Sequence, residues 1–437
     1  MNKPLLAACM LLLAGSAMAA DLVESLQAAK AFDATYQAAR QTWVAGQEKT
    51  AQAQALMLPK VTLSGNAGYG WTDYNAAAAG SSYNKRGEGY GYGVSASQPL
   101  YRVENLVGAD QLRLQVRQVE IQYHAAEQDL ILRLAKAYFD VLAAQEKMRV
   151  IAAQKEAISQ QLALARKSFE VGVATITDTD EAQTRYDAML SQEIAAANDL
   201  SVKQQVFAML TALDPEKLAP AGEQARAMAP DPAEFSAWST RAESGNYSLI
   251  GQQLGLAIAK REIDKYRAET SPSLDLVAKY NDKWDPARNT GTDRTGTSSI
   301  ELQLSIPLYT GGNRSSQLKE AIAKEDAQRS TVEATRRNVI QSTQSAFLGV
   351  KNGAAQIRAL QQALVSSKSL VDSTALGQEV GVRTTIDVLN AQQQYYSTRY
   401  DLMVARYNYL YARLQLEAVA GDLSEEDVQN INAWLIK

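Results

Sequence analysis

The sequence predicts a mainly α-helical chain built from two copies of one large unit, each with long helices and one β-hairpin. The motif EVGVATITDTDEAQ at 170–183 returns as EVGVRTTIDVLNAQ at 379–392, identical at eight positions at an offset of 209 residues. That period is far longer than a solenoid repeat, so each copy is a whole subdomain. Long stretches rich in Ala, Gln, Leu, Arg and Glu have almost no Pro or Gly, which is typical of long helices. Four other segments alternate apolar and polar residues as strands do.

The first element is a predicted signal peptide at 1–20. Lys3 supplies the positive start, residues 5–14 form the apolar run, and small residues at 17–20 form a cleavage site. The only cysteine, Cys9, lies in a poor match to a lipoprotein box, because most of the apolar run follows it. Cleavage removes Cys9, so we expect an exported protein without disulfides.

The remaining chain lacks a run of about 20 apolar residues, so we expect no transmembrane helix. The 437-residue sequence has a net charge of −4 and no basic cluster. This composition argues against nucleic acid as a partner.

Repeats and helix breakers divide the chain into nine expected segments. They are a signal peptide at 1–20, a helix at 21–58, a β-hairpin at 61–98, a long helical hairpin at 100–212, an irregular segment at 213–245, a helix at 246–270, a β-hairpin at 273–306, a long helical hairpin at 310–421 and an irregular segment at 422–437.

Each long helical hairpin is expected to turn at a Val-Gly-Val sequence, at Gly172 in the first and Gly381 in the second. In the second hairpin the apolar residues follow the alternating three- and four-residue steps of a coiled-coil seam. We interpret this stripe as core packing and not as a ligand surface: Leu389, Tyr396, Tyr400, Met403, Tyr407, Leu410 and Leu414.

The two β-hairpins have strands of the length and alternation of outer-membrane barrel strands. A half-buried soluble sheet gives the same alternation, but the connecting loops at 72–89 and 282–299 are long and polar, as extracellular barrel loops are. Four strands cannot close a barrel, and an open edge is not permitted in lipid. If these strands cross a membrane, several chains must share the barrel.

Taken together, the chain resembles the TolC family of outer-membrane channel-tunnels along essentially its whole mature length. The resemblance rests on the duplicated hairpins, the Pro-Leu-Tyr sequences at 99–101 and 307–309, Tyr-Thr-Gly-Gly at 309–312 and the two Val-Gly turns. It implies a homotrimer with a twelve-stranded barrel, four strands per protomer, continued by a long periplasmic α-helical barrel. The segments at 213–245 and 422–437 then form a small mixed equatorial domain.

The resemblance also implies a gate at the periplasmic ends of the helices. In the family, acidic rings line the closed aperture; here Asp387 matches the first acidic position, and Asn390 replaces the second. The family's gate latch links an Asp after the first turn to an Arg and a Tyr near the second turn. We name the matching positions the latch residues: Thr177, Asp178, Gln378 and Arg383, with Gln378 in place of the tyrosine.

A simpler interpretation of the two aspartates is helix capping. Thr175 to Asp178 and Thr384 to Asp387 both fit the Ser/Thr-x-x-acid pattern of a helix N-terminus. The capping and gating roles are compatible with each other. Arg383 has no such local role, because a helix N-terminus disfavours a cation, and we expect it to have a carboxylate partner.

The sequence contains no catalytic motif, so we predict neither an enzyme nor a cofactor. His124 is the only histidine and is expected on a solvated helix surface, not in a metal site.

We therefore predict an exit duct in the outer membrane of a Gram-negative bacterium, extending into the periplasm. The sequence around the first turn is similar to members that serve type I protein secretion, with an inner-membrane ABC transporter and a periplasmic adaptor as partners. Three alternatives remain open: efflux of drugs or metals with a proton-driven pump, a structural coiled-coil adaptor, and a free-standing porin.

Overall fold

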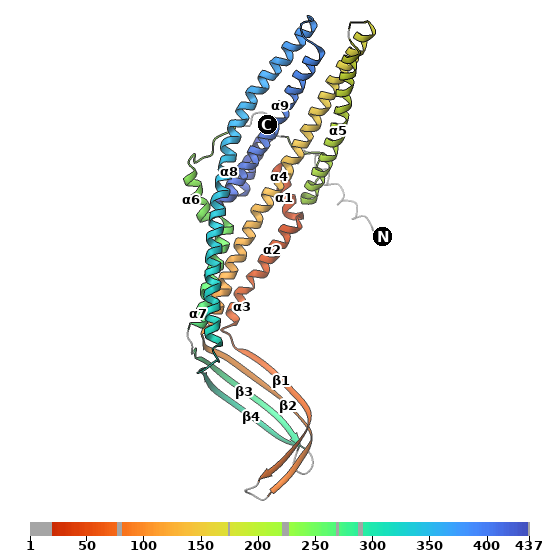
Figure 1. Ribbon diagram of the computed structural model, residues 1–437. Helices are drawn as coiled ribbons and strands as arrows, with labels where there is room; N and C mark the ends of the chain where they lie inside the picture. Colours follow the sequence, from red (N-terminus) through yellow and green to blue (C-terminus); the bar gives the residue numbers. More distant parts are fainter. Residues whose placement is uncertain are drawn as a thin grey trace, which may run out of the picture. The chain divides into compact units, whose positions relative to one another are not determined.

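The structure is a computed structural model that describes residues 20–76, 81–173, 175–220, 227–267, 271–286 and 292–435. These residues form helices and four strands (Figure 1). In chain order the elements are α1 Leu22–Phe32, α2 Ala34–Gln47, α3 Lys49–Ala55, β1 Lys60–Ala76, β2 Ser81–Arg102, α4 Val103–Glu170, α5 Ile176–Thr211, α6 Phe235–Gly245, α7 Tyr247–Tyr266, β3 Ser273–Pro286, β4 Thr292–Ser305, α8 Asn313–Glu379, α9 Thr385–Ala420 and α10 Glu425–Leu435.

Residue contacts divide the chain into two compact units. The first unit contains the residues up to Arg40, Tyr123–Ile250 and Thr335–Lys437. The second contains Gln41–Gln122 and Gly251–Ala334. Among the described residues, no helix has an 18-residue stretch apolar enough to cross a membrane.

The duplication seen in the sequence is also present in the helices. The long first helices α4 and α8 have 68 and 67 residues, and their partners α5 and α9 have 36 residues each. The turns need glycine, because Gly172 and Gly381 have φ of +79° and +75°, in the left-handed region. The chain thus reverses at the same tight turn in each long helical hairpin.

The core of the first unit packs α4, α5, α6, α9 and α10 around large apolar side chains. Tyr138, Phe207 and Trp238 are at most 1% exposed. The C-terminal part of the predicted apolar stripe on α9 belongs to this core, since Tyr407, Leu410 and Leu414 are all buried. The interpretation of the stripe as core is confirmed there.

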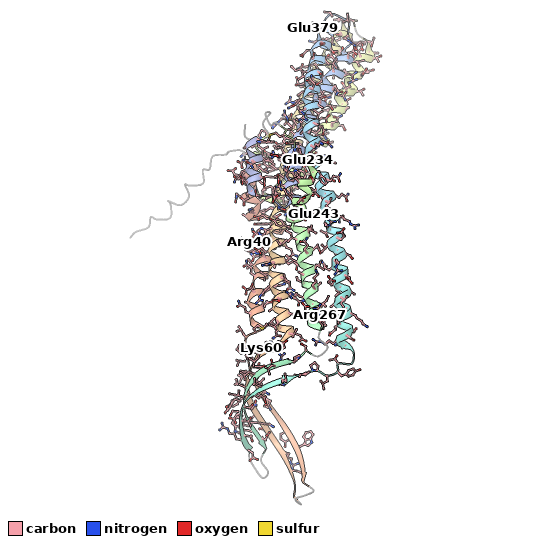
Figure 2. All side chains as sticks on the ribbon, turned by 90° about the vertical axis from the view of Figure 1, so that its left-hand side faces the viewer. Arg40, Lys60, Glu234, Glu243, Arg267 and Glu379 are labelled. Carbon is pink, nitrogen blue, oxygen red and sulfur yellow. The ribbon has the colours of Figure 1, made fainter. Side chains whose placement is uncertain are left out.

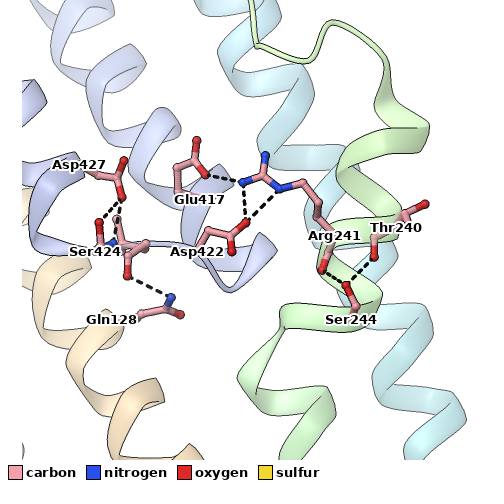
Figure 3. A network of polar contacts seen from close by, with 9 residues as sticks. Gln128, Thr240, Arg241, Ser244, Glu417, Asp422, Ser424 and Asp427 are labelled. Carbon is pink, nitrogen blue, oxygen red and sulfur yellow. Dashed lines mark hydrogen bonds and ion pairs between the residues drawn. The ribbon is translucent and has the colours of Figure 1, made fainter.

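Arg241 on α6 joins this helix to the end of α9 (Figure 3). Its Nε donates to Asp422 at 3.0 Å, and its guanidinium also lies 3.5 Å from Glu417. Burial raises the pKa of Glu417, although Arg241 opposes that shift. Nearby, the backbone N–H of Ser424 donates to Asp427 at 2.9 Å and caps α10.

The expectation that 213–245 and 422–437 are irregular is wrong at α6 and α10, which are helices of 11 residues each. Both helices bury an apolar side, through Trp238 and Ala242 in α6 and through Val428, Ile431 and Leu435 in α10. Tertiary packing of a short amphipathic face stabilises helices of this length, which are marginal alone.

The first expected helix, 21–58, is instead three consecutive helices. Asp33 separates α1 from α2 with an extended backbone, and its Oδ1 accepts a hydrogen bond from the backbone N–H of Tyr36 at 2.7 Å. An aspartate that caps the next helix interrupts the first one.

The second unit holds one antiparallel sheet in the order β1-β2-β3-β4. Leu63 pairs with Val94, Val94 with Tyr280, and Tyr280 with Ser298, so these residues share one face. That face presents exposed apolar side chains along all four strands: Val61, Leu63, Tyr69, Trp71, Tyr90, Tyr92, Val94, Leu276, Tyr280, Ile300, Leu302 and Leu304.

The opposite face of the sheet is polar, and Lys279 there forms an ion pair with Glu301 at 3.0 Å. Within the described residues, the outer edges of β1 and β4 pair with no further strand. A sheet with one apolar exposed face and two open edges needs a surrounding lipid phase and further strands.

Candidate functional site

The candidate site lies in the first unit, at the ends of the α4–α5 and α8–α9 hairpins that carry the Val-Gly-Val turns. Glu379, the last residue of α8, marks this end in Figure 2. A cleft of about 630 Å³ lies here, lined by residues of both hairpins. Asp178, Gln378 and Arg383 all line it, so three of the four predicted latch residues share one space.

Both predicted capping patterns are present as complete capping boxes. Asp178 accepts from the backbone N–H of Thr175 at 2.9 Å and from its hydroxyl at 2.8 Å. Asp387 accepts from the backbone N–H and hydroxyl of Thr384 at 2.9 and 3.0 Å. The capping interpretation of the two aspartates is therefore confirmed.

The caps also explain the ionisation of the two aspartates. Donation from the Thr175 backbone N–H is the largest cause that lowers the pKa of Asp178 below its ordinary value, followed by the Thr175 hydroxyl. Asp387 has a lowered pKa for the same reasons from Thr384, with a smaller contribution from Arg383. Both carboxylates are charged at neutral pH.

Arg383 and Asp178 form no ion pair within the described part of this chain, although they line the same cleft. The Gln378 side-chain amide donates to the Thr385 hydroxyl at 3.0 Å, so it bridges α8 to the start of α9. Thr177 is exposed. The latch assignment therefore stays a prediction.

The two predicted aperture residues lie on the first turns of α9, where Asp387 is half-buried and Asn390 is exposed. The Oδ1 of Asn390 accepts a hydrogen bond from Arg185 Nη1 at 3.1 Å. Arg185 lies on α5 and is also paired with Glu181 at 2.9 Å. Sequence reasoning missed Arg185, and only its i,i+4 pairing with Glu181 is visible in the sequence.

His124, the only histidine of the sequence, does not line this cleft. His124 is 43% exposed, lies 3.7 Å from Glu127 and stacks on Tyr247. No group of three potential metal ligands occurs among the residues that the structure describes. Cys9 lies outside the described residues.

Comparisons with known proteins agree with the duplicated architecture. The family model of the outer membrane efflux proteins matches residues 16–212 and 238–422. The outer membrane protein TolC of Vibrio cholerae is 33% identical over 391 residues, covering 89% of this chain and 87% of that protein. The alkaline protease secretion protein AprF of Pseudomonas aeruginosa is 29% identical and covers 98% of this chain and 90% of its own length. The proteases secretion protein PrtF of Dickeya chrysanthemi is 28% identical, and the match covers 96% of this chain and 92% of that protein.

Solved structures share the fold at low sequence identity. The outer membrane protein VceC of Vibrio cholerae has a TM-score of 0.78 at 14% identity, covering 92% of this chain and 96% of that one. The CmeC outer membrane channel of Campylobacter jejuni has a TM-score of 0.79 at 14% identity, and the match covers 95% of this chain and 89% of that one. The predicted fold class and the outer-membrane location are confirmed. The chain belongs to the family of outer membrane efflux proteins.

Proposed function

We propose that this protein is the outer-membrane exit duct of a type I system, in which an inner-membrane ABC transporter and a periplasmic adaptor deliver a protein substrate. The observation that carries the proposal is its similarity to AprF and PrtF, both named for protease secretion, over 98% and 96% of the chain. The open-edged sheet and long helical hairpins supply the membrane and periplasmic parts of such a duct.

The test is deletion of the gene in its source bacterium, followed by analysis of the culture medium and of drug susceptibility. We expect one or a few proteins to disappear from the medium and to return on complementation. Unchanged secretion combined with greater drug sensitivity would instead support the alternative, the outer-membrane component of a proton-driven efflux pump.

The hairpin turns are the proposed docking site for the adaptor. Val171, Val173, Val380 and Val382 are between 66% and 78% exposed. Four large apolar side chains held in water at the turns of both hairpins suit a partner that covers them. The Val-Gly-Val turns then serve both to reverse the chain and to present this apolar surface.

We expect the mature protein to be a trimer, because four strands with two open edges cannot seal a barrel in lipid. Chemical cross-linking in detergent is expected to give a ladder that ends at three subunits. A monomer or dimer that retains an intact membrane barrel would contradict the shared barrel and the trimer with it.

Asp387 is proposed to form a ring of three carboxylates at the aperture of the trimer, with Asn390 on the same face of α9. Charges in a narrow low-dielectric pore attract cations. We expect Asp387→Asn to weaken block by a trivalent cation by about tenfold in planar bilayers. Thr384→Ala is the matched control, because it breaks the same capping box without removing a charge. If both variants lower thermal stability and neither changes block, Asp387 acts only as a cap.

A further inference from the structure

One polar contact joins the two helical hairpins of this protomer near their turns. Arg185 Nη1 on α5 donates to Asn390 Oδ1 on α9 at 3.1 Å. The guanidinium is held from its other side by Glu181, one turn earlier on α5, at 2.9 Å. Arg185 is half-buried, with 26% of its side chain exposed, and its guanidinium has a partner on each side.

The neighbouring contacts make this hydrogen bond important for the position of the hairpins. Beside it, Ile158, Met189 and Leu389 form a small buried cluster that joins α4, α5 and α9. The next polar link between the hairpins, Arg399 to Glu146 at 3.3 Å, lies further from the turns. Among the described residues, no other hydrogen bond or ion pair links the hairpins between Arg185 and the two turns.

The adjoining side of α9 borders the cleft between the hairpins. Val388 and Gln392 face the cleft between the hairpins, together with Gln161 of α4. The side-chain carbonyl oxygens of Gln161 and Gln392 are buried and have no hydrogen-bond partner among the residues that the structure describes. Unpaired buried acceptors are unfavourable, so these two glutamine oxygens add no polar link that would hold the hairpins at their present spacing.

We propose that Arg185, held by Glu181, and Asn390 form a tether that keeps the two hairpins of one protomer together and sets how readily the tip opens. The proposal rests on the exit duct proposed above, whose gate, implied by the family resemblance, lies at the helical tip and opens to pass substrate. It gives Asn390 a second role besides that of an aperture residue. A neutral amide makes a weaker hydrogen bond to a guanidinium than a carboxylate does. The tether can therefore be broken when the partner proteins bind.

The test combines single-channel recording with a distance measurement on the purified trimer. The variants are Arg185→Ala, Asn390→Ala and the double variant. Arg166→Ala is the matched control, because Arg166 also donates to an amide oxygen, that of Gln183 at 2.7 Å, but within the α4–α5 hairpin. Spin labels attached at Val173→Cys and Val382→Cys report the distance between the two turns. The only natural cysteine is Cys9, in the predicted signal peptide, so we expect no other cysteine to be labelled in the mature protein.

We expect each tether variant to raise the open population about threefold to tenfold, and the double variant to add nothing further. The two single variants and the double variant are also expected to widen the distribution of distances between the spin labels. Arg166→Ala is expected to leave this distribution unchanged. Asn390→Asp is expected to lower the open population only while Arg185 is present, because it turns the contact into an ion pair.

The two proposals fail in different ways. If the wild-type protein forms no pore, the proposed duct fails, and the spin-label distances in detergent still decide whether the tether exists. If the protein forms a pore but Arg185→Ala and Asn390→Ala match Arg166→Ala in both measurements, or if their effects add as independent changes, the tether is overturned.

Discussion

Tyr138→Ala is expected to destabilise the helical core of the first unit by about 3–5 kcal/mol. The Tyr138 ring is fully buried and packs edge-on against Phe139 and Phe207, with ring centroids 6.0 and 6.1 Å away. Its hydroxyl donates to the Ala219 carbonyl at 2.8 Å, which fixes the segment that follows α5. Alanine leaves a large cavity between α4 and α5 and an unsatisfied carbonyl.

Tyr138→Phe is the matched control, because it keeps the ring and removes only the hydroxyl. We expect it to cost about 1–2 kcal/mol, the penalty for an unpaired buried carbonyl. Guanidinium denaturation in detergent, followed by the helical circular dichroism signal, measures both changes. If Tyr138→Ala is no worse than Tyr138→Phe, the ring is not part of a packed core.

Local signals in the sequence predicted much of the fold. The Thr-x-x-Asp patterns at Thr175 and Thr384 gave the starts of α5 and α9, because a capping box depends on neighbouring residues only. The same pattern occurs at Ser424 and Asp427 and marks the start of α10, which we expected to be irregular. A helix of 11 residues among prolines and loops gives too short a periodic pattern to outweigh that composition.

The second strand continues further than its sequence suggests. The alternation of apolar and polar residues predicts a strand that ends at Gln98, directly before Pro99, which has no N–H to donate to a neighbouring strand. The structure continues β2 to Arg102 by shifting the register between Pro99 and Tyr101. Arg102 then forms a bidentate ion pair with Asp275 of β3, with Nε 2.9 Å from Oδ1. A contact between residues 173 positions apart has no local signal.

The same limit applies to the candidate site. Asp178, Gln378 and Arg383 were found by matching a family pattern near the turns, and the structure brings all three to one cleft. Arg185 was missed because its partner Asn390 is 205 positions away and belongs to the other repeat. Packing between the repeats, and not either repeat alone, creates that contact.

Opening of the channel is expected to increase about tenfold to a hundredfold when the latch between Asp178 and Arg383 is lost. Arg383 lies just before α9, where the helix dipole disfavours a cation, and it has no carboxylate ion pair within the described residues of its own chain. We propose that in the trimer it pairs with Asp178 across the closed tip. One partly exposed ion pair contributes about 0.5–1 kcal/mol, so three copies bias closure by about 1.5–3 kcal/mol. At 1.4 kcal/mol per factor of ten, this bias gives the expected range.

The pH dependence of opening has a definite sign. Because the pKa of Asp178 is lowered, its charge and its cap contribute at pH values above its ordinary pKa of 3.8 and are lost as the pH falls through the lowered value. Acidification is therefore expected to open the wild-type channel only once the pH falls below this lowered pKa, which itself lies under 3.8, and to have little further effect on Asp178→Ala.

Single-channel recording of Asp178→Ala, Arg383→Ala and the double variant tests the latch directly. Asp178→Ala also removes a cap, so Thr175→Ala is the control that breaks the same capping box while it leaves the carboxylate charge in place. Because Gln378 is occupied with Thr385 and the family's tyrosine is absent, the Asp178 to Arg383 pair is expected to act without a second link. The double variant should therefore open no more than either single variant. Effects that add independently, or a Thr175→Ala channel that opens as much as Asp178→Ala, would show that Asp178 only caps its helix and that Arg383 closes the tip in another way.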